Sequence, residues 1–468
     1  MDFLNRLDDL AAIDDAWTAA AFEGQFFVLW GRRRVGKTEL LNHFANDKRA
    51  FYFEATDATE TIQLRNLSDE LAVASSNPLF REAPFPSWRA ALEGISQFVG
   101  AERTLVVLDE FQFLAARQQE LATLLNTWLR RTGRHLPMLF IIAGSEVSFF
   151  REEVLGGQLY GRRTGQLAVR PFSPADASLF VPKYSPEDKV RTYAICGGMP
   201  YYLAIFDDEL PLEENILGNI LYRGGLLHEE AELLLRQELP DPLNYFSVLD
   251  AIAHGCTRNA QIAARTGLGL AQVSTTLRTL ARLELVEQRR PATASRTSSK
   301  TSWAILDGFL NFHFRFVEPF RSRLRTRRDA QKHLADEVLP NLDHFVSKPA
   351  WEHICQQHLL WAEGAKSVGA WWGKVQVAPQ RTEEREVDAV AVDINGSVTA
   401  TGSCKWTNAL LDADEDKFLT AMEAHIPGAD DVQRHYFFSR TGFDEKLNRL
   451  ASADPDRYKL ITPSDLFT

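Results

Sequence analysis

One stretch near the N-terminus restricts the possible folds more than any other, an apolar run followed by a glycine-rich turn. Residues 26–30 read Phe-Phe-Val-Leu-Trp, which is typical of a buried strand, and residues 31–38 match the spacing GxxxxGK[ST] before helix-forming residues follow. In this context Gly31 and Gly36 let successive backbone N–H groups point at phosphate oxygens, with the positive end of a helix behind them. The pattern predicts a phosphate-binding loop (P-loop).

The P-loop also suggests which side chains contact a nucleotide. Lys37 can reach the β- and γ-phosphates, and Thr38 can offer its hydroxyl to Mg²⁺. We therefore expect ATP or ADP together with Mg²⁺ as cofactors. Arg6, in the segment before the loop, is either a further nucleotide contact or a surface arginine at a helix start. The expected nucleotide-binding residues are Gly31, Arg34, Val35, Gly36, Lys37 and Thr38.

A second apolar run, residues 104–108, ends in the two acids Asp109 and Glu110. This is the pattern of a buried parallel strand that delivers carboxylates to the edge of a sheet. We expect Asp109 to hold Mg²⁺, commonly through water, and Glu110 to act as the general base that polarises the attacking water. Strands ending in acids are common, and the position downstream of a P-loop makes this one specific.

Two further sites could sense the γ-phosphate or stabilise its transfer. The apolar run 137–144 ends at Ser145, which is either a γ-phosphate sensor or a helix N-cap. Arg162 and Arg163 stand in a glycine-flanked turn, and either could act as an arginine finger, in cis or in trans, or be a solvated surface residue. A later stretch, residues 195–203, predicts a tight turn between helices that contains Gly198 and Pro200.

Composition bounds the class of protein. The 468 residues suggest about three domains of roughly 150 residues, and 45% hydrophobic with 25% charged residues is ordinary globular composition. No apolar run approaches the roughly 18 residues of a membrane span, and no signal pattern opens the chain, so we expect a cytoplasmic protein without membrane contact. The cysteines lack CxxC spacing, which predicts buried thiols rather than disulfides or zinc: Cys196, Cys256, Cys355 and Cys404.

Residues 241–305 predict a winged helix-turn-helix. Three helices are expected at 245–254, 259–267 and 271–283, followed by strands at 285–291 and 302–305 around a Ser/Thr/Arg-rich tip. Residues 257–303 contain eight Arg or Lys against two Glu, although the whole chain has a net charge of −11. Such a cationic module suits double-stranded DNA, and an intramolecular scaffold or protein contact is the alternative. The candidate DNA contacts are Arg265, Arg278, Arg282, Arg289 and Arg290.

The C-terminal part has the sequence pattern of restriction-endonuclease-like nucleases. An acid on a helix, an Asp on one strand and a Lys on the next would bind Mg²⁺ and activate water. The candidates are Glu352, Glu386, Asp388 and Lys405. The pattern requires an acid two residues before Lys405, and Ser403 stands there instead, a poor Mg²⁺ ligand. Glu386, on the same strand face as Asp388, could supply a displaced carboxylate. We favour a degenerate nucleic-acid-binding or structural domain over an active nuclease.

These patterns together give an α/β fold class. We expect a P-loop αβα ATPase core over 1–172, a helical lid over 173–240, and a winged helix-turn-helix with a linker over 241–330. A C-terminal α/β restriction-endonuclease-like domain is expected over 331–468.

The order of the motifs resembles the archaeal-type ATPases, relatives of the AAA+ and STAND signalling ATPases. The matching residues are the P-loop, Leu-Asp-Glu-Phe at 108–111, Gly-Ser at 144–145, Tyr-Gly-Arg at 160–162, Gly-Gly-Met-Pro-Tyr-Tyr-Leu at 197–203, the winged helix, Trp-Trp at 371–372, Glu-Val-Asp at 386–388 and Gly-Ser-Cys-Lys-Trp at 402–406. The resemblance implies Mg-ATP at Gly31 to Thr38, Asp109 and Glu110, and a winged helix whose orientation responds to nucleotide.

The resemblance also bears on the lid and on the C-terminal domain. Gly197 to Pro200 looks like the STAND-type Gly-x-Pro turn, which in that group lies near the nucleotide and couples it to the lid. Family C-terminal domains usually carry Glu where this chain has Ser403. The resemblance therefore does not imply nuclease chemistry.

Three functions fit the sequence. The favoured one is a nucleotide-dependent switch in which ATP orders the lid and winged helix and slow hydrolysis resets them. The alternatives are a DNA-processing enzyme in which ATP licenses Mg²⁺-dependent cleavage, and a nucleotide-controlled scaffold for protein partners. Either a homo-oligomer or a protein partner is compatible with these patterns.

Overall fold

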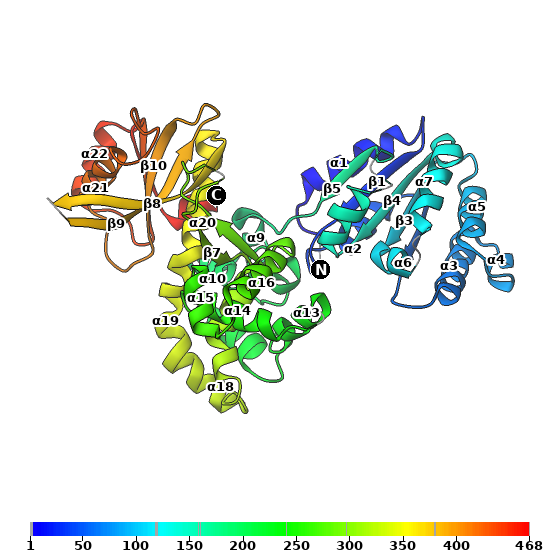
Figure 1. The fold of residues 1–468 in the computed structure, drawn as a ribbon, viewed down its shortest axis with the longest axis horizontal. Coiled ribbons are helices and arrows are strands. Elements are labelled where there is room, and N and C mark those ends of the chain that lie inside the picture. The colour runs from blue at the N-terminus through cyan, green and yellow to red at the C-terminus, as the bar shows by residue number, and fades with distance from the viewer. Residues whose placement is uncertain are drawn as a thin grey trace. The chain divides into compact units, whose positions relative to one another are not determined.

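The structure is a computed structural model that divides into two compact units. The first comprises Met1–Pro171 with Met199–Tyr201, and the second comprises Phe172–Gly198 with Tyr202–Thr468. We describe each unit by itself (Figure 1). The residues that the structure describes are 3–117, 120–157, 159, 161–239, 241–295, 297–378 and 381–467.

A parallel sheet organises the first unit. Its strand order in the described residues is β2-β3-β4-β1-β5, and neighbouring strands pair parallel. The sequence did not predict the edge strand β5, because Gly-Gln-Leu-Ala contains neither an apolar run nor an alternation. The strands are β1 (Gln25–Trp30), β2 (Ala50–Glu54), β3 (Thr104–Asp109), β4 (Met138–Gly144) and β5 (Gly165–Ala168).

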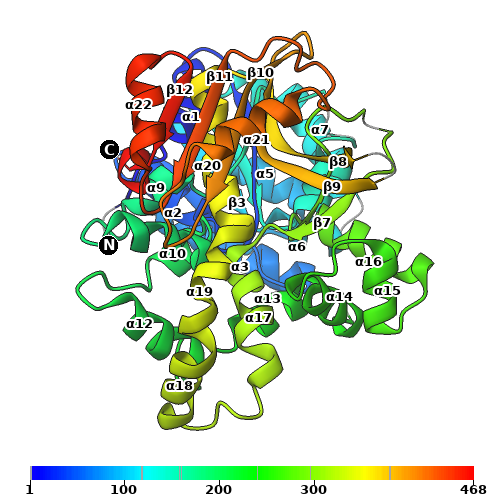
Figure 2. The ribbon, with the colours of Figure 1, turned by 90° about the vertical axis from the view of Figure 1, so that its left-hand side faces the viewer.

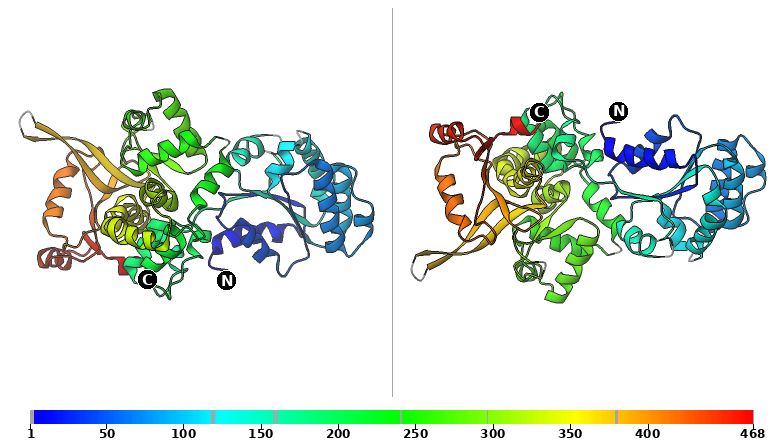
Figure 3. Two further views of the ribbon diagram at one scale, coloured as in Figure 1. Left: turned by 90° about the horizontal axis from the view of Figure 1, so that it is seen from below. Right: turned by 90° about the horizontal axis from the view of Figure 1, so that it is seen from above.

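Helices cover both faces of this sheet, as the two views of Figure 3 show. Alternate side chains of the central strands, such as Val106 and Leu108, enter a core with α3, α5 and α7, while Leu105 and Val107 are buried on the other face. Burial on both faces explains the continuous apolar runs. The helices are α1 (Leu7–Ala19), α2 (Lys37–Ala45), α3 (Glu60–Ser75), α4 (Leu79–Glu82), α5 (Trp88–Val99), α6 (Phe111–Arg117), α7 (Leu121–Arg131) and α8 (Val147–Phe149).

The second unit begins with helices, as predicted for residues 174–240. Two of them start at a Ser-Pro pair, where Ser173 and Ser185 accept hydrogen bonds from the backbone N–H groups of Asp176 and Asp188. The serine caps the helix and proline fits its first turn, so the local sequence sets both starts. The helices are α9 (Pro174–Ser178), α10 (Pro186–Cys196), α11 (Pro200–Leu203), α12 (Leu212–Asn215) and α13 (Glu230–Glu238).

The predicted winged helix-turn-helix is confirmed in its elements. Gly267 ends the second helix of the module with a φ of +73°, a conformation that favours glycine. The two strands pair antiparallel, with Val286 opposite Ile305. The elements are α14 (Leu243–Ala253), α15 (Asn259–Thr266), α16 (Leu270–Arg282), β6 (Val286–Arg289) and β7 (Ser302–Ile305), and the helices α17 (Gly308–Phe316), α18 (Arg327–His333) and α19 (Leu339–Phe345) follow.

A mixed sheet forms the C-terminal part of the second unit (Figure 2). Its order is β12-β11-β10-β9-β8, antiparallel among β8, β9 and β10 and parallel among β10, β11 and β12. A turn at Asn395-Gly396, a residue pair typical of hairpins, joins β9 to β10, with Gly396 at a φ of +89°. The elements are α20 (Glu352–Glu363), β8 (Ser367–Ala378), β9 (Arg381–Val392), β10 (Val398–Lys405), α21 (Asp414–Glu423), β11 (Arg434–Ser439), α22 (Glu445–Ala453) and β12 (Tyr458–Ile461).

No helix in the described part of the chain combines the length and the apolar composition that crossing a bilayer requires.

Candidate functional site

Strand order brings the predicted nucleotide residues to one edge of the first sheet. The P-loop follows β1, Asp109 ends β3 and Ser145 follows β4, which lies between β1 and β3. Because all these strands are parallel, their carboxyl ends meet at the same edge. The pairing of Glu54 with Asp109 adds the end of β2 to this edge. Glu54 is thus a carboxylate near the site that the sequence analysis did not identify.

The P-loop curls around the amino group of Lys37. This buried group donates to the carbonyl oxygens of Gly31 and Arg32, at 3.0 and 3.1 Å. Gly36, with a φ of +86°, is the cap residue of α2, so the loop leads directly into a helix N-terminus. Arg34 also has a positive φ, of 71°, and its guanidinium lies 4.1 Å from the ring centroid of Tyr201. The ammonium group is therefore held where a loop-bound phosphate would meet it.

Arg6 corrects the expectation for the segment before the loop. Its guanidinium donates to the carbonyl oxygens of Val35, at 2.7 Å, and of Arg170, at 2.6 Å, and the residue is buried. It also pairs with Asp9 at 3.0 Å. Arg6 is thus at the start of α1, as one alternative expected, but it is buried rather than at the surface and satisfies backbone carbonyl groups of the loop and of Arg170.

Asp109 collects hydrogen bonds from three directions. Its Oδ2 accepts from the Thr38 hydroxyl at 3.1 Å and from the Tyr52 hydroxyl at 2.5 Å, and its Oδ1 accepts from the Glu110 N–H at 2.8 Å. Burial, together with the charge of Asp109, raises the pKa of Tyr52 well above its usual range, so the phenol remains a donor. The contact with Thr38 brings together the two residues expected to share Mg²⁺. Tyr52 was not identified from the sequence.

The negative charge at this edge fits a divalent cation. Burial first, and then the nearby charges of Asp109 and Glu110, raise the pKa of Glu54 above its ordinary value. No set of three or more His, Cys, Asp or Glu in the described residues could hold a metal by itself. Thr38 and Asp109 are therefore the residues that would hold Mg²⁺, with nucleotide phosphates and water completing its coordination.

Glu110 lies beside Ser145 in an unusual backbone conformation. Its φ is +49°, and its Oε2 accepts a hydrogen bond from the Ser145 hydroxyl at 2.9 Å. The amide of Gln112 also donates to this Oε2 and to Ser145 Oγ, the latter at 3.3 Å. The N-cap alternative for Ser145 is wrong, because the cap position of α8 is Glu146, which makes no side-chain cap bond.

The two candidate arginine fingers lie at the other edge of the sheet. Thr164, next to Arg163, donates its N–H to Phe26 at the start of β1, whereas Val169 donates to Trp30 at its end. Five residues of strand, roughly 16 Å, therefore separate the arginines from the P-loop edge. Arg162 donates to Asn126 at 2.9 Å. The direction of β5 therefore argues against a role of Arg162 or Arg163 as an arginine finger in cis. Tyr160, of the same sequence motif, lies outside the described residues.

The predicted lid turn includes a close backbone approach. A Cβ added to Gly198 would lie 2.0 Å from the carbonyl oxygen of Phe172, whose N–H donates to the Gly198 carbonyl at 2.7 Å. Only glycine fits there. Two residues later Pro200 belongs to the first unit, where its Cγ would lie 3.4 Å from a Cβ at Gly36. Pro200 therefore borders the P-loop.

The five candidate DNA contacts lie on α15, α16 and the wing. Arg278 and Arg282 are exposed on α16, where Arg278 donates to the Ser274 carbonyl oxygen at 3.3 Å and to the Thr275 hydroxyl at 3.2 Å. The other three contact neighbours within the winged helix: Arg265 pairs with Asp250 at 3.2 Å, Arg289 pairs with Glu287, and Arg290 donates to Gln288 at 2.6 Å. Arg296, counted in the basic charge of the module, lies outside the described residues.

The winged helix also contacts the C-terminal sheet. The N–H of Ala292, in the wing, donates to the carbonyl oxygen of Ala370 on β8 at 2.9 Å, and Arg258 pairs with Glu384 on β9 at 2.9 Å. The wing therefore borders an edge strand of this sheet.

The nuclease-like candidates form two separate ion-pair groups. Lys348 contacts Glu386 at 2.8 Å and Glu352 at 3.1 Å. Lys405 lies 3.4 Å from Asp388 and 3.7 Å from Glu415, while Asp388 also accepts from the Cys404 N–H at 2.8 Å. Each lysine neutralises its own carboxylates. In the described part of the chain no three or more His, Cys, Asp or Glu residues are grouped so that they could hold a metal ion.

Glu352 and Ser403 show how this cluster differs from the nuclease pattern. Burial raises the pKa of Glu352 to about 7; Lys348 opposes this rise, and the charges of Asp388 and Glu386 add to it. The Ser403 hydroxyl donates at 2.7 Å to Glu415, which comes from α21. The carboxylate beside Ser403 is therefore Glu415 and not the displaced Glu386 that the strand pattern suggested.

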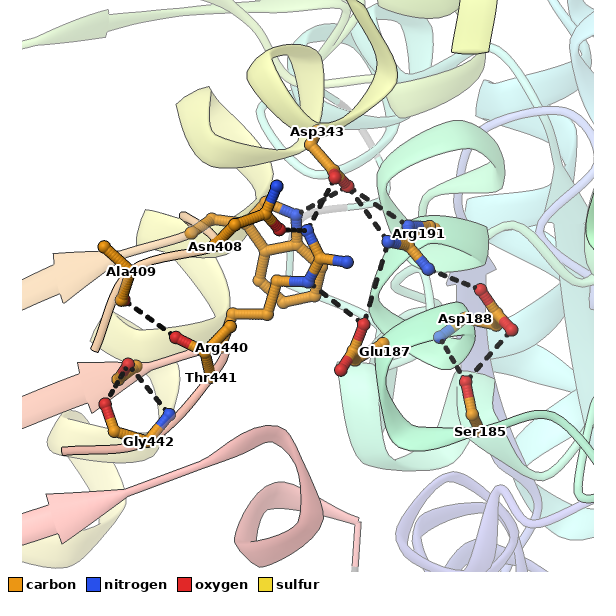
Figure 4. Close-up of polar contacts among 12 residues, drawn as sticks. Ser185, Glu187, Asp188, Arg191, Asp343, Asn408, Ala409, Arg440, Thr441 and Gly442 are labelled. Atoms are coloured by element: carbon orange, nitrogen blue, oxygen red, sulfur yellow. Dashed lines mark hydrogen bonds and ion pairs between the residues drawn. The ribbon is translucent and has the colours of Figure 1, made fainter. Parts of the chain in front are cut away.

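A third polar cluster joins helix α10 to the C-terminal part of the second unit (Figure 4). Asp343 on α19 accepts from Arg191 of α10 at 3.1 Å and from Arg440, after β11, at 2.5 Å. Trp406 donates to the same carboxylate at 3.1 Å, and Arg440 also pairs with Glu187 at 3.0 Å. Helix α10, helix α19 and the segment after β11, which lie far apart in the sequence, thus share one network of ion pairs.

Comparisons with known proteins agree with this architecture. Residues 3–206 match a family model of ATPase domains predominantly from Archaea. Residues 244–290 match the IclR helix-turn-helix domain, and residues 313–418 match a family of archaeal and bacterial proteins of unknown function. An uncharacterised protein of Methanocaldococcus jannaschii is 25% identical over 452 residues, which cover 95% of this chain and 97% of that protein.

Two solved structures of archaeal proteins are similar to this chain. A Walker-type ATPase of Pyrococcus abyssi is similar with a TM-score of 0.50 and 19% identity, covering 67% of this chain and 96% of its own. The ORC2 protein of Aeropyrum pernix, in ADPNP–ADP complexes, covers 72% of this chain and 96% of its own at 14% identity and a TM-score of 0.47. The family-model matches, together with the P-loop geometry, show an archaeal-type P-loop ATPase domain over residues 3–206, which a helix-turn-helix domain and a further domain of unknown function follow.

Proposed function

We propose that this protein is a nucleotide switch that binds Mg-ATP at the first sheet and hydrolyses it slowly. The observation that carries the proposal is the hydrogen bond between Thr38 and Asp109, which unites the start of α2 with the end of β3. That pair is where a P-loop ATPase needs one hydroxyl and one carboxylate on the same cation.

The residues at this edge suit phosphoryl transfer to water. The N–H groups of the loop would bind the β-phosphate, and Lys37 would leave the carbonyls of Gly31 and Arg32 to neutralise the γ-phosphate. Mg²⁺, held by Thr38 and Asp109, would supply charge stabilisation of the phosphate oxygens. Glu110 would accept a proton from the attacking water.

The switch requires that nucleotide be sensed beyond the P-loop, and Pro200 offers a route. It borders Gly36 in the first unit, α10 of the second unit precedes it, and α11, which begins at Pro200, enters the second unit at Tyr202. A change in the loop on nucleotide binding would therefore act on the lid through Pro200. The contact of α10 with Asp343 would pass it to the C-terminal part.

We further propose that the exposed face of α16 binds double-stranded DNA. Arg278 and Arg282 are exposed on α16, the helix that enters the major groove in modules of this kind. The wing, in contact with β8, would contribute less in this arrangement. With DNA bound at this surface, the switch would couple DNA binding to ATP hydrolysis.

We do not propose nuclease activity for the C-terminal domain. Its acids are paired in two lysine-centred groups, and a serine replaces the expected ligand. The domain would serve as a binding or structural element. If it does not bind DNA, it would bind a protein partner or a second copy of the chain.

The test of the proposed function combines binding and turnover. Lys37→Ala should weaken ATP binding by at least 10-fold, whereas Glu110→Gln should retain binding and lose hydrolysis by about 100-fold, the usual contribution of a positioned base. Isothermal titration with Mg-ATP and single-turnover hydrolysis give the two readouts. An unchanged dissociation constant for Lys37→Ala would refute the P-loop assignment, and equal turnover for Glu110→Gln would refute the base.

A further inference from the structure

Gln112 is a buried side chain at the catalytic edge that the proposed function does not yet use. It lies in the first turn of α6, two residues after Glu110, and is 4% exposed. Its amide nitrogen donates to Glu110 Oε2 and, at 3.3 Å, to Ser145 Oγ. Ser145 in turn donates to the same Oε2 at 2.9 Å. Gln112, Ser145 and Glu110 therefore form a closed triangle.

The orientation of this amide is fixed by charge. Were the amide turned over, its oxygen would face the Glu110 carboxylate, and two acceptors would repel each other. With the nitrogen toward Glu110, the amide oxygen Oε1 is buried without a hydrogen-bond partner in the structure. An unpaired buried oxygen is unfavourable. An apolar side chain would avoid this cost, so packing alone does not explain why glutamine occupies the position.

The Gln112 amide fits beside β4 because residue 144 is a glycine. A Cβ at Gly144 would lie 2.1 Å from the amide oxygen of Gln112 and 2.6 Å from the ring of Phe150, which is completely buried. The absence of a side chain at residue 144 therefore makes the Gln112 position possible. The backbone of β4, α6 and the Phe150 ring together hold the amide against Glu110.

Gln112 and Ser145 both donate to one oxygen of the Glu110 carboxylate and leave its other oxygen without a contact from either of them. The hydrogen bonds from Gln112 and Ser145 to the Glu110 carboxylate both end on Oε2, and in the described residues no donor contacts Oε1. A carboxylate fixed by two donors on one oxygen presents the second oxygen in a defined direction. The backbone of Glu110, with its φ of +49°, adds to this restraint.

We propose that Gln112 is a positioning residue for ATP hydrolysis, which holds Glu110 so that Oε1 faces the attacking water. The proposal rests on the proposed function, because it assigns Gln112 a role through the base Glu110. Ser145 would then serve two groups, the γ-phosphate and the base, and Gln112 would keep Glu110 oriented when Ser145 turns toward the phosphate.

The test is Gln112→Met in the full-length protein. Methionine has a similar length, removes the donor and also removes the unpaired oxygen, so folding should be retained. We expect kcat to fall about 10-fold or more, since small misplacements of a catalytic group have effects of this size. The dissociation constant of Mg-ATP should not change. Gln97→Met, at an exposed position of α5, is the matched control and should leave both values unchanged.

A second background separates positioning from a general structural effect. In Glu110→Gln, the further change Gln112→Met should not reduce residual single-turnover hydrolysis, because there is no base left to orient. An equal fall in both backgrounds, or full kcat in Gln112→Met alone, would overturn the inference. If Glu110→Gln itself hydrolyses ATP like the unaltered protein, the proposed function fails as well. An inactive Glu110→Gln with a fully active Gln112→Met refutes only the role of Gln112.

Discussion

The buried carboxyl of Glu352 should make the C-terminal part of the second unit less stable as pH rises. Its pKa of about 7 stands well above the ordinary value of 4.5, with burial as the main cause. A carboxyl whose folded pKa is raised contributes stability that is fully present below pH 4.5 and is lost as pH rises through about 7. The difference of about 2.5 pKa units corresponds to about 3 kcal/mol, at about 1.4 kcal/mol per unit.

Glu352→Gln should remove this loss. The amide resembles the protonated acid in shape and remains neutral, so the variant should match the unaltered protein at pH 4.5 and exceed it at pH 8 by up to about 3 kcal/mol. Glu386→Gln is the matched control, since Glu386 contacts the same Lys348 at a more exposed position. Removing that half-exposed partner should change stability by at most about 1 kcal/mol.

Hydrogen exchange of the β9 and β10 amides measures this local stability. Comparing each variant with the unaltered protein at the same pH cancels the intrinsic pH dependence of exchange. A Glu352→Gln variant that is no more stable than the unaltered protein at pH 8 would refute the reasoning. So would a strong stabilisation of the unaltered protein by Mg²⁺ at pH 8, because a metal held by Glu352 would lower the cost of its charge.

Three other predictions follow from contacts described above. Tyr52→Phe removes a buried donor to Asp109 and should lower the free energy of unfolding by about 1–2 kcal/mol; an unchanged thermal midpoint would contradict this. Asp343→Asn should lower the free energy of unfolding at pH 7 by about 1 kcal/mol after solvent screening. Burial raises the pKa of the Asp343 carboxyl, but Trp406 and two guanidinium groups outweigh this effect and hold the pKa below its ordinary value of 3.8. The difference in stability should therefore disappear as pH falls below 3.8. Titration of a short duplex at several salt concentrations tests Arg278→Glu and Arg282→Glu, each of which should reduce the salt slope by about 1; equal slopes would exclude contact through α16.

Local patterns predicted the elements well. The apolar runs before Lys37 and Asp109 identified β1 and β3, because strands buried on both faces must be apolar throughout. The winged helix was predicted from helix periods, Gly267 and the two short strands. The short edge strand β5 was missed, since half-buried strands of four residues carry little pattern.

Partners across the fold could not be predicted from one sequence. Tyr52 reaches Asp109 only because β2 lies next to β3, and Glu415 reaches Ser403 only because α21 packs on β10. Neither pairing leaves a spacing in the chain. Gln112 lies only two residues after Glu110, so the sequence could have suggested a contact between them. The orientation of the Gln112 side chain could not be predicted, because it depends on the space that Gly144 leaves.

The brief return of the chain to the first unit at residues 199–201 matters for how the protein can be dissected. A fragment that stops at residue 172 would contain the whole P-loop but not Pro200, which borders Gly36. Its nucleotide affinity would then report on an incomplete site. The match of the ATPase family model extends to residue 206 and so includes this segment. The smallest autonomous nucleotide-binding piece is therefore expected to end beyond Tyr201.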